Sequence, residues 1–331
     1  MNDKTTQSAA TRPKTSVSED ILASASILYY SEGLTQQEIA VRMGVSRATV
    51  VNYLKLAREQ NIVDIRIRGA SFASGGLSRA LKERFGLADV YVAENLDPET
   101  GEPTHARAAV NSLVARVGAM ALHDILKPDD RLGIAWGETM QYLANHLPAG
   151  TVERLSVYQL VGSMKSPLMS AAETCAIRIA SRFNADIYTL HAPAVLSTAT
   201  LAKALRDEPV IKGQLDNFAR LTCNLFSVGS CDPESHIVQS SIASMKDLEW
   251  YRNRGAVAVL CGRFIDAAGA HIVGELDERI IGITPQEMRS CGRGILVAGG
   301  ASKLEAIRAV LTGGYATHLV IDAETGQKLL G

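Results

Sequence analysis

The chain has 331 residues, which is more than one hydrophobic core usually organises, so two unequal domains are expected. Hydrophobic residues make up 47% of the chain and charged residues 21%, a composition typical of globular proteins that excludes a chain dominated by disorder. The formal net charge of -1 provides no overall attraction for nucleic acid. Any DNA-binding activity must therefore depend on a local surface.

The beginning of the chain and its cysteines bear on location and cofactors. No run approaches eighteen consecutive apolar residues, and the first twenty residues are polar, so we expect neither export nor a membrane span. The five cysteines are scattered and form no CxxC pair, which indicates neither a zinc ribbon nor a disulfide framework. We expect a cytoplasmic protein with no bound metal, no resident cofactor and no membrane partner.

The N-terminal region begins with a polar tail and a first helix. Residues 1–17 lack periodicity and are predicted to be a disordered tail. Ser18 is the predicted N-cap of a helix in which apolar residues such as Leu22 and Ala25 recur at helical spacing. Gly33 is expected to end this helix.

Two further helices follow at a close spacing. Thr35 is expected to cap a short helix over Gln36–Met43, and Gly44 to supply the tight connection after it. Ser46 is expected to cap the next helix, Arg47–Gln60, which has one apolar and one polar face.

This spacing meets the requirements of a helix-turn-helix. The motif needs a small residue at the helix crossing, a glycine in the turn and an apolar anchor in the second helix, and Ala40, Gly44 and Val50 provide them. The polar face would then meet DNA, with Arg47 and Asn52 as the expected base readers. The candidate DNA-binding residues are Gln36, Ser46, Arg47, Thr49, Asn52, Lys55 and Arg58, with Arg66 and Arg68 as further phosphate contacts.

A change of pattern marks a domain boundary after this region. Residues 62–68 alternate as in a half-exposed strand, which predicts a small wing and a helix-turn-helix domain over residues 18–68. Residues 69–78 are rich in Gly and Ser and are predicted to be a linker. Residues 79–331 are expected to form the effector and oligomerisation domain.

In this second domain predicted strands alternate with helices. The expected strands are Val90–Ala93, Arg131–Ala135, Ser156–Val161, Asp186–Leu190, Leu225–Val228, Ala256–Cys261, Ile295–Ala298 and His318–Ile321. The clearest helices are Thr104–Leu126, Glu138–Asn145, Ala171–Phe183 and Lys303–Leu311. The predicted fold class is α/β, with a winged-type helix-turn-helix followed by a doubly wound, mostly parallel α/β domain.

Several motifs together resemble the SorC-type (SorC/DeoR-like) sugar-binding transcriptional regulators. They are Tyr29-Tyr30, Gly33-Leu34-Thr35-Gln36-Gln37-Glu38-Ile39-Ala40, Val45-Ser46-Arg47 and Ala57–Val63 in the first domain, then Gly133–Thr139, Gln159–Ser163, Phe264-Ile265-Asp266 with Gly269, and Ala298-Gly299-Gly300 with Lys303. The resemblance implies an effector domain related to glucosamine-phosphate deaminase and ribose-phosphate isomerase, which binds a sugar phosphate or a similar molecule without converting it. The chain departs from the family pattern at Ser163 and at residues 227–230, so its effector chemistry is expected to differ.

Two glycine-rich turns are candidate effector contacts. Gly137, Glu138 and Thr139 follow a predicted strand and open a helix, where backbone N–H groups can approach a ligand. The Glu138 carboxylate disfavours a phosphate there and suits hydroxyl groups, and both alternatives stay open. Gly299 and Gly300 form a second such turn, in which Lys303 supplies a cation for an anionic group or is an ordinary solvated lysine.

Other strand ends complete the candidate effector site. Asp266 either accepts hydrogen bonds from sugar hydroxyls or shapes a turn. Pro193 and His191 end a predicted strand, where open α/β sheets place ligand contacts. The full set of effector candidates is Gly137, Glu138, Thr139, Gly162, Ser163, Pro193, Asp266, Gly299, Gly300 and Lys303.

These features predict a transcriptional regulator, most simply a repressor, of a carbohydrate or polyol operon. Its expected partners are double-stranded operator DNA, a sugar, polyol or sugar-phosphate effector, and further copies of itself as a homodimer or homotetramer. An isomerase or deaminase with a DNA-binding head is the alternative, but its candidate groups, Asp266, Glu275, Asp277 and His191, are dispersed. A scaffold with a helical cap and no affinity for DNA is a third hypothesis.

Overall fold

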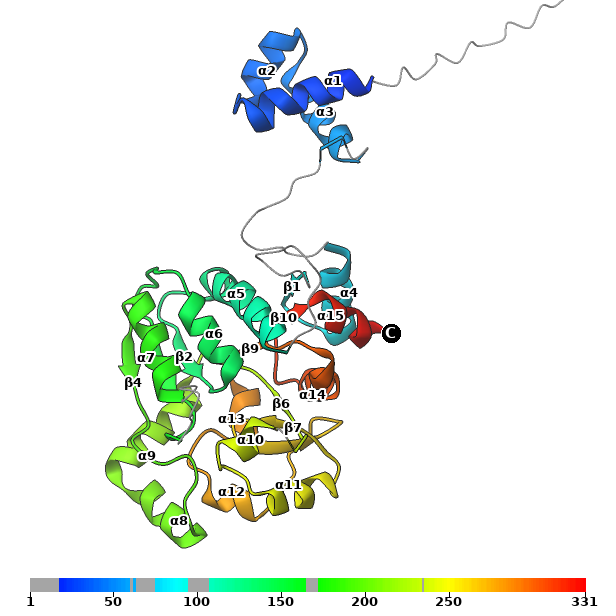
Figure 1. Ribbon diagram of the computed structural model, residues 1–331. Helices are drawn as coiled ribbons and strands as arrows, with labels where there is room; N and C mark the ends of the chain where they lie inside the picture. Colours follow the sequence, from blue (N-terminus) through cyan, green and yellow to red (C-terminus); the bar gives the residue numbers. More distant parts are fainter. Residues whose placement is uncertain (1–17, 60–61, 64–74, 95–106, 165–171, 234) are drawn as a thin grey trace, which may run out of the picture. The chain divides into compact units, whose positions relative to one another are not determined.

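The computed structural model describes residues 18–59, 62–63, 75–94, 107–164, 172–233 and 235–331 (Figure 1). The chain forms two compact units, Met1–Ile67 and Arg68–Gly331. The predicted tail, most of the predicted wing and the first part of the predicted linker lie outside the described residues. The end of the linker prediction is wrong, because helix α4 (Gly75–Phe85) already includes residues 75–78.

The first unit has the predicted helices. Helix α1 (Glu19–Ser26) continues into a π-helical turn, η1 (Ile27–Ser31), and is followed by α2 (Gln36–Met43) and α3 (Arg47–Glu59). Ser18 occupies the predicted N-cap position, although its side chain makes no capping hydrogen bond.

Local side-chain contacts define the ends of the two helices of the helix-turn-helix. Thr35 and Glu38 form a reciprocal capping box at the start of α2. Gly44 ends α2 with a φ of 67°, a left-handed conformation that favours glycine. The Ser46 hydroxyl accepts a hydrogen bond from the Thr49 N–H at 3.1 Å and so caps α3. The buried cluster that joins the helices comprises Leu28, Ile39, Ala40, Val50 and Leu54.

The second unit is built on a parallel sheet. Among the described residues seven strands form it, in the order β1-β10-β9-β5-β2-β3-β4, and every pair is parallel. The strands are β1 (Asp89–Ala93), β2 (Arg131–Ile134), β3 (Ser156–Gln159), β4 (Asp186–Tyr188), β5 (Cys223–Phe226), β9 (Arg293–Val297) and β10 (His318–Asp322). Residues alternate along β10 between two large buried clusters, Leu319 and Ile321 in one and Val320 in the other. Both faces of the sheet are therefore covered, as in a doubly wound fold.

Helices and short turns connect and cover these strands. They are α5 (Arg107–Ile125), α6 (Glu138–His146), α7 (Ala172–Phe183), α8 (Ala199–Asp207), α9 (Pro209–Leu215), η2 (Asp216–Arg220), α10 (His236–Gln239), α11 (Met245–Arg252), α12 (Glu275–Arg279), α13 (Pro285–Ser290), η3 (Ala301–Lys303), α14 (Leu304–Thr312) and α15 (Ala323–Leu330). The predicted helix from Lys303 thus begins one residue later, after a 3₁₀ turn that includes Lys303. In the described part of the chain, no helix combines the length and the apolar character needed to cross a membrane.

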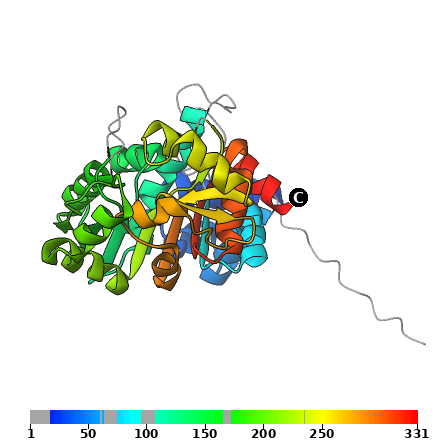
Figure 2. The same ribbon diagram turned by 90° about the horizontal axis from the view of Figure 1, so that it is seen from below.

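A second, smaller sheet lies beside the parallel one and was not predicted as a separate sheet. It contains β6 (Gly229–Ser230), β7 (Ala256–Leu260) and β8 (Arg263–Asp266), all antiparallel, in yellow tones in Figure 2. The predicted strand Ala256–Cys261 therefore belongs to a hairpin. Its two turn residues, Cys261 and Gly262, have φ values of 48° and 85°, as a tight hairpin turn requires. A cysteine is uncommon at the first of these turn positions, and the hairpin was therefore not predicted from the sequence.

Candidate functional site

The candidate DNA-binding face lies on α2 and α3 of the first unit. Arg47 and Asn52 are exposed on α3, and the Arg47 guanidinium donates a hydrogen bond of 3.4 Å to the Gln36 side chain at the start of α2. Next to them the hydroxyls of Ser46 and Thr49 lie 2.8 Å apart. The N-terminal ends of the two helices therefore present donors and acceptors side by side, as contacts to bases and phosphates require.

The remaining DNA candidates are less completely placed. Lys55 is exposed on α3, two turns from Arg47. The side chain of Arg58 and all of Arg66 and Arg68 lie outside the described residues. The hydrophobic face of α3, with Val50, Leu54 and Ala57, is buried. Charge and polarity are thus restricted to the opposite face, as the sequence predicted.

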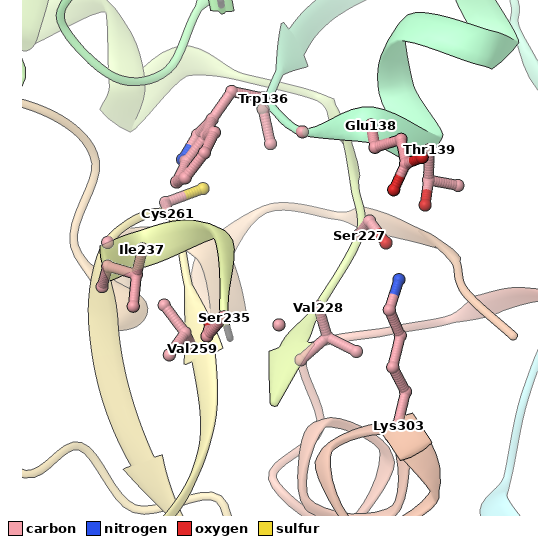
Figure 3. A pocket seen from close by; sticks show the side chains of 14 residues that line it. Trp136, Glu138, Thr139, Ser227, Val228, Ser235, Ile237, Val259, Cys261 and Lys303 are labelled. Carbon is pink, nitrogen blue, oxygen red and sulfur yellow. The ribbon is translucent and has the colours of Figure 1, made fainter. Parts of the chain in front are cut away.

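The second unit contains a pocket beside the carboxyl ends of β2 and β5. The space between its lining residues is about 530 Å³ when the open mouth is included, and the enclosed part is about 60 Å³, so the pocket is a small cavity with an open mouth. The lining residues are Ala135, Trp136, Gly137, Glu138, Thr139, Ser227, Val228, Gly229, Ser235, Ile237, Val259, Cys261, Gly262 and Lys303 (Figure 3). The pocket lies at the strand ends where ligands of open α/β sheets bind.

Backbone geometry explains why helix α6 begins at the pocket. Gly137 is its N-cap residue and has a φ of 124°, which a residue with a side chain rarely adopts. In the preceding strand, a side chain at Gly133 would come within 2.5 Å of Leu160. These glycines let β2 pack closely and turn sharply into α6, which places Glu138 and Thr139 on the pocket wall.

A buried amide connects the polar groups of the pocket. Asn111 on α5 donates a hydrogen bond of 3.0 Å to the Glu138 carboxylate. Its carbonyl oxygen accepts hydrogen bonds of 3.3 Å from the Thr139 hydroxyl and from Lys303 Nζ. Asn111 therefore orients an acid, an alcohol and an amine toward the same region.

Lys303 has an unusual environment for a lysine. Only 9% of the residue is exposed, and burial, aided by the positive charge of Arg107, lowers its pKa to about 8 although Glu138 opposes this shift. A desolvated amine with one neutral partner at 3.3 Å retains donors for a ligand. Lys303 can thus bind an anion when protonated or donate to a hydroxyl or carbonyl oxygen.

The predicted glycines at the second turn position Lys303 and do not line the pocket. The Gly300 N–H donates to Asp322 Oδ2 at 2.8 Å and to Thr325 Oγ1 at 2.9 Å. A side chain at Gly299 would lie 2.4 Å from Asp322 Oδ2. Because the Gly300 N–H already has two acceptors, the prediction of an anion cradle at this turn is not supported by its geometry.

Four other effector candidates also lie outside the pocket lining. Ser163 pairs with Pro193 in a β-bridge, and its hydroxyl donates to Glu173 at 3.1 Å. Gly162 packs directly against the backbone of Pro193. Asp266 Oδ1 accepts hydrogen bonds from the N–H groups of residues 268 and 270, at 2.9 and 2.8 Å, so it shapes a turn.

The groups considered for catalysis are not assembled. Asp277 is buried with Arg263, Tyr251 and His271, which all hydrogen-bond to its carboxylate. His191 is exposed and, like Asp277, is not part of the pocket lining. Within the described residues no group of three or more His, Cys, Asp or Glu side chains is placed to hold a metal ion.

Sequence reasoning missed most of the pocket. Asn111, which orients the polar groups of the pocket, lies within the predicted helix Thr104–Leu126 and was not singled out, and Trp136 appeared only within the motif Gly133–Thr139. Ser227, Val228 and Gly229 were noted as a departure from the family pattern, and this was the available indication that they matter. The residues at 235–237 and 259–262 carried no sequence signal for a site.

Comparisons with known proteins agree with this architecture. The Sugar-bind family model, described as a sugar-binding domain, matches residues 70–331, and the model of sigma-70 region 4 matches residues 27–60. The Escherichia coli transcriptional regulator YjhU is 35% identical over 94% of both chains, and the Bacillus subtilis deoxyribonucleoside regulator is 30% identical over 92% of this chain and 96% of its own.

Solved structures show the same fold. The full-length sorbitol operon regulator SorC from Klebsiella pneumoniae superposes with a TM-score of 0.69 at 24% identity, over 95% of this chain and 99% of that chain. The relatives are named as regulators, so the isomerase or deaminase alternative is not favoured. With its helix-turn-helix and its sugar-binding domain, this chain belongs to the SorC-type family of sugar-binding transcriptional regulators.

Proposed function

We propose that this regulator represses an operon for carbohydrate or polyol use and responds to a sugar, polyol or sugar phosphate in the pocket around Lys303. The observation that carries the proposal is the hydrogen-bonded wall of Asn111, Glu138, Thr139 and Lys303. Such a set of oriented donors and acceptors suits a hydroxylated ligand. Relatives named for sorbitol, deoxyribonucleosides and erythritol support the substrate class.

The first unit is proposed to bind operator DNA through α3. Arg47 and Asn52 read bases, and Gln36, Ser46, Thr49, Lys55 and Arg58 contact phosphates or neighbouring bases. Phosphate contacts make the affinity depend on salt. Since operators commonly present two half-sites, the active form is a homodimer or homotetramer in the cytoplasm.

The effector controls DNA affinity by thermodynamic linkage. A ligand changes the affinity only if it binds one conformational state of the protein better than another, and by no more than that difference. By the same linkage, operator DNA changes the effector affinity by the same factor. Lys303, Glu138 and Thr139 are the residues expected to contact the effector, with Gly137 at the helix start beside them.

Fluorescence anisotropy with DNA from upstream of the gene tests this function. Specific binding is expected, one metabolite from a panel of sugars, polyols and their phosphates should shift it, and Arg47→Ala should weaken it by about 1–3 kcal/mol. Arg42→Ala is the matched control, because Arg42 is an exposed arginine on α2 that pairs with Glu32 at 3.0 Å. Absence of specific binding at any salt concentration would refute the proposal.

A further inference from the structure

The two sides of the pocket differ sharply in chemistry. In Figure 3, Glu138, Thr139, Ser227 and Lys303 lie on one side. Trp136, Ile237, Val259 and Cys261 lie on the other side. We refer to these sets as the polar wall and the apolar wall. A ligand that fills the pocket must match both walls.

The polar wall is prepared for a hydroxylated group. Ser227 Oγ is shielded from solvent and has no hydrogen-bond partner among the described residues. A buried hydroxyl without a partner is destabilising, so a ligand that supplies one gains affinity. The Glu138 carboxylate, which lines the pocket, is oriented by a hydrogen bond of 3.0 Å from Asn111. Together with Lys303 Nζ these atoms can satisfy adjacent hydroxyl or carbonyl oxygens.

The apolar wall offers little to a hydroxyl group. The side chains of Ile237 and Val259 cannot form hydrogen bonds and are 1% and 6% exposed. Burial raises the pKa of the Cys261 thiol to about 12, so this group stays neutral and is a weak donor. Among the described lining residues on this side, one hydroxyl is present, that of Ser235 beside Val259.

This asymmetry bears on which sugars fit. An ordinary aldose or polyol carries an oxygen on every carbon, so some hydroxyl would have to face Ile237, Val259 and Cys261. A hydroxyl that faces the side chains of Ile237 and Val259 would lose its water and gain no partner from them, which weakens binding. A methyl or methylene group at that position would instead be stabilised by burial against the wall.

We infer that the effector is a deoxy sugar or deoxy polyol, free or phosphorylated, whose deoxygenated carbon faces the apolar wall and whose hydroxyls face the polar wall. This inference rests on the proposed function, because it takes the pocket as the effector site. The two walls of one cavity, and the unpartnered Ser227 hydroxyl between them, carry it.

The pocket contains its own spectroscopic probe. The chain has two tryptophans, Trp136 in the pocket lining and Trp250 on α11, where the Arg254 guanidinium covers its ring at 3.6 Å. In a Trp250→Phe background the emission of Trp136 reports ligand binding without any DNA. Matched pairs that differ by one hydroxyl are L-rhamnose with L-mannose, L-fucose with L-galactose, and 2-deoxy-D-ribose 5-phosphate with D-ribose 5-phosphate.

In at least one pair the deoxy compound should bind about 10- to 100-fold more tightly than its hydroxylated partner, the range over which an apolar pocket rejects an added hydroxyl. Val259→Thr, which places a hydroxyl on the apolar wall at nearly constant volume, should reduce that ratio. Val273→Thr is the control, since Val273 is an exposed valine (68%) that is not part of the pocket lining, and it should leave the ratio unchanged.

The inference is overturned if the hydroxylated partner binds equally or more tightly in every pair, or if no deoxy compound perturbs Trp136. It is also overturned if Val273→Thr lowers the ratio as much as Val259→Thr, because the effect would then not come from the pocket wall. Failure of the proposed function gives a different result, the loss of specific, Arg47-dependent DNA binding in the anisotropy assay. The two failures are therefore distinguishable.

Discussion

The DNA-binding unit and the effector unit are assembled by interactions of different range. In the first unit each helix end is defined within a few residues, by the Thr35–Glu38 capping box, by Gly44 and by Ser46. In the second unit the pocket unites residues as distant in sequence as Ala135 and Lys303. A short stretch of sequence therefore specifies the DNA-reading surface, whereas the sensing surface exists only after the whole sheet has formed.

The comparison extends to how each unit is stabilised. We refer to the first unit as the head. Among the described residues the cluster that joins the helices of the head has five members, while two large clusters cover the faces of the parallel sheet. Small domains bury a smaller fraction of their surface and are closer to unfolding. The larger unit can accommodate buried charges, and Asp277 and Lys303 are two of them. Substitutions that probe these features should separate the two units.

The largest effect is expected for Asp277→Asn in the second unit. Arg263, which is 5% exposed, would lose its buried counter-charge, and breaking a buried ion pair from one side destabilises by about 3–5 kcal/mol. Urea unfolding followed by Trp136 and Trp250 emission measures this change. Tyr251→Phe, which removes one hydrogen bond to the same carboxylate, should have a smaller effect.

The same carboxylate predicts a pH dependence. Burial alone would raise the pKa of Asp277, but hydrogen bonds from His271, Tyr251, the Gly274 N–H and Arg263 outweigh it and hold the pKa well below its usual range. A carboxyl whose pKa is depressed by folding contributes stability above its unfolded pKa, near pH 4, and loses it as the pH falls. The wild type should lose stability more steeply below pH 4 than Asp277→Asn. Equal slopes would exclude this role.

The next largest effect is expected in the head, for Ile39→Ala. Ile39 is fully buried in a cluster of five residues, and truncation should cost about 2–5 kcal/mol, enough to unfold a small unit. DNA binding should disappear, while the emission of the tryptophans, which both belong to the second unit, stays unchanged. Val41→Ala, an exposed position on the same helix, is the control. A parallel loss of the tryptophan signal would contradict the independence of the two units.

The contrast between the units also explains what could be predicted from sequence. Capping residues and the glycine turn act locally, so the helices of the head were predicted within about two residues at their ends. Short, nearly continuous apolar runs predicted the strands of the parallel sheet, because strands buried on both faces are apolar throughout. The β7–β8 hairpin was missed because its turn uses Cys261, and most of the pocket was missed because Trp136, Ser227 and Ile237 meet only through long-range folding.

A fourth prediction concerns Lys303 in the second unit, where the substitution should increase stability instead of reducing it. The pKa of Lys303 is lower in the folded chain than in the unfolded chain, so the unfolded state holds more protons between about pH 8 and pH 10, and stability rises with pH across that window. Lys303→Met should therefore stabilise the second unit at pH 7 by about 1–3 kcal/mol and abolish the effector response. Urea unfolding at pH 7 and pH 9.5 measures the gain, which should shrink at the higher pH. Lys212→Met, an exposed lysine, should give no gain.

The smallest expected effect tests whether the head depends on local contacts. Thr35→Ala removes the hydroxyl that accepts a hydrogen bond from the Glu38 N–H at 3.3 Å and donates one to the Glu38 carboxylate at 2.7 Å, and should cost about 1 kcal/mol. Thr35→Ser, which keeps the hydroxyl, should restore most of that stability. The measurement is the thermal unfolding of the head by circular dichroism, with DNA affinity as the second readout. Because α2 supports the first turn of α3, a frayed start of α2 should weaken DNA binding without changing its sequence preference. If Thr35→Ala left both stability and affinity unchanged, the small buried cluster would be sufficient to hold the helices, and the head would resemble the second unit in its dependence on packing.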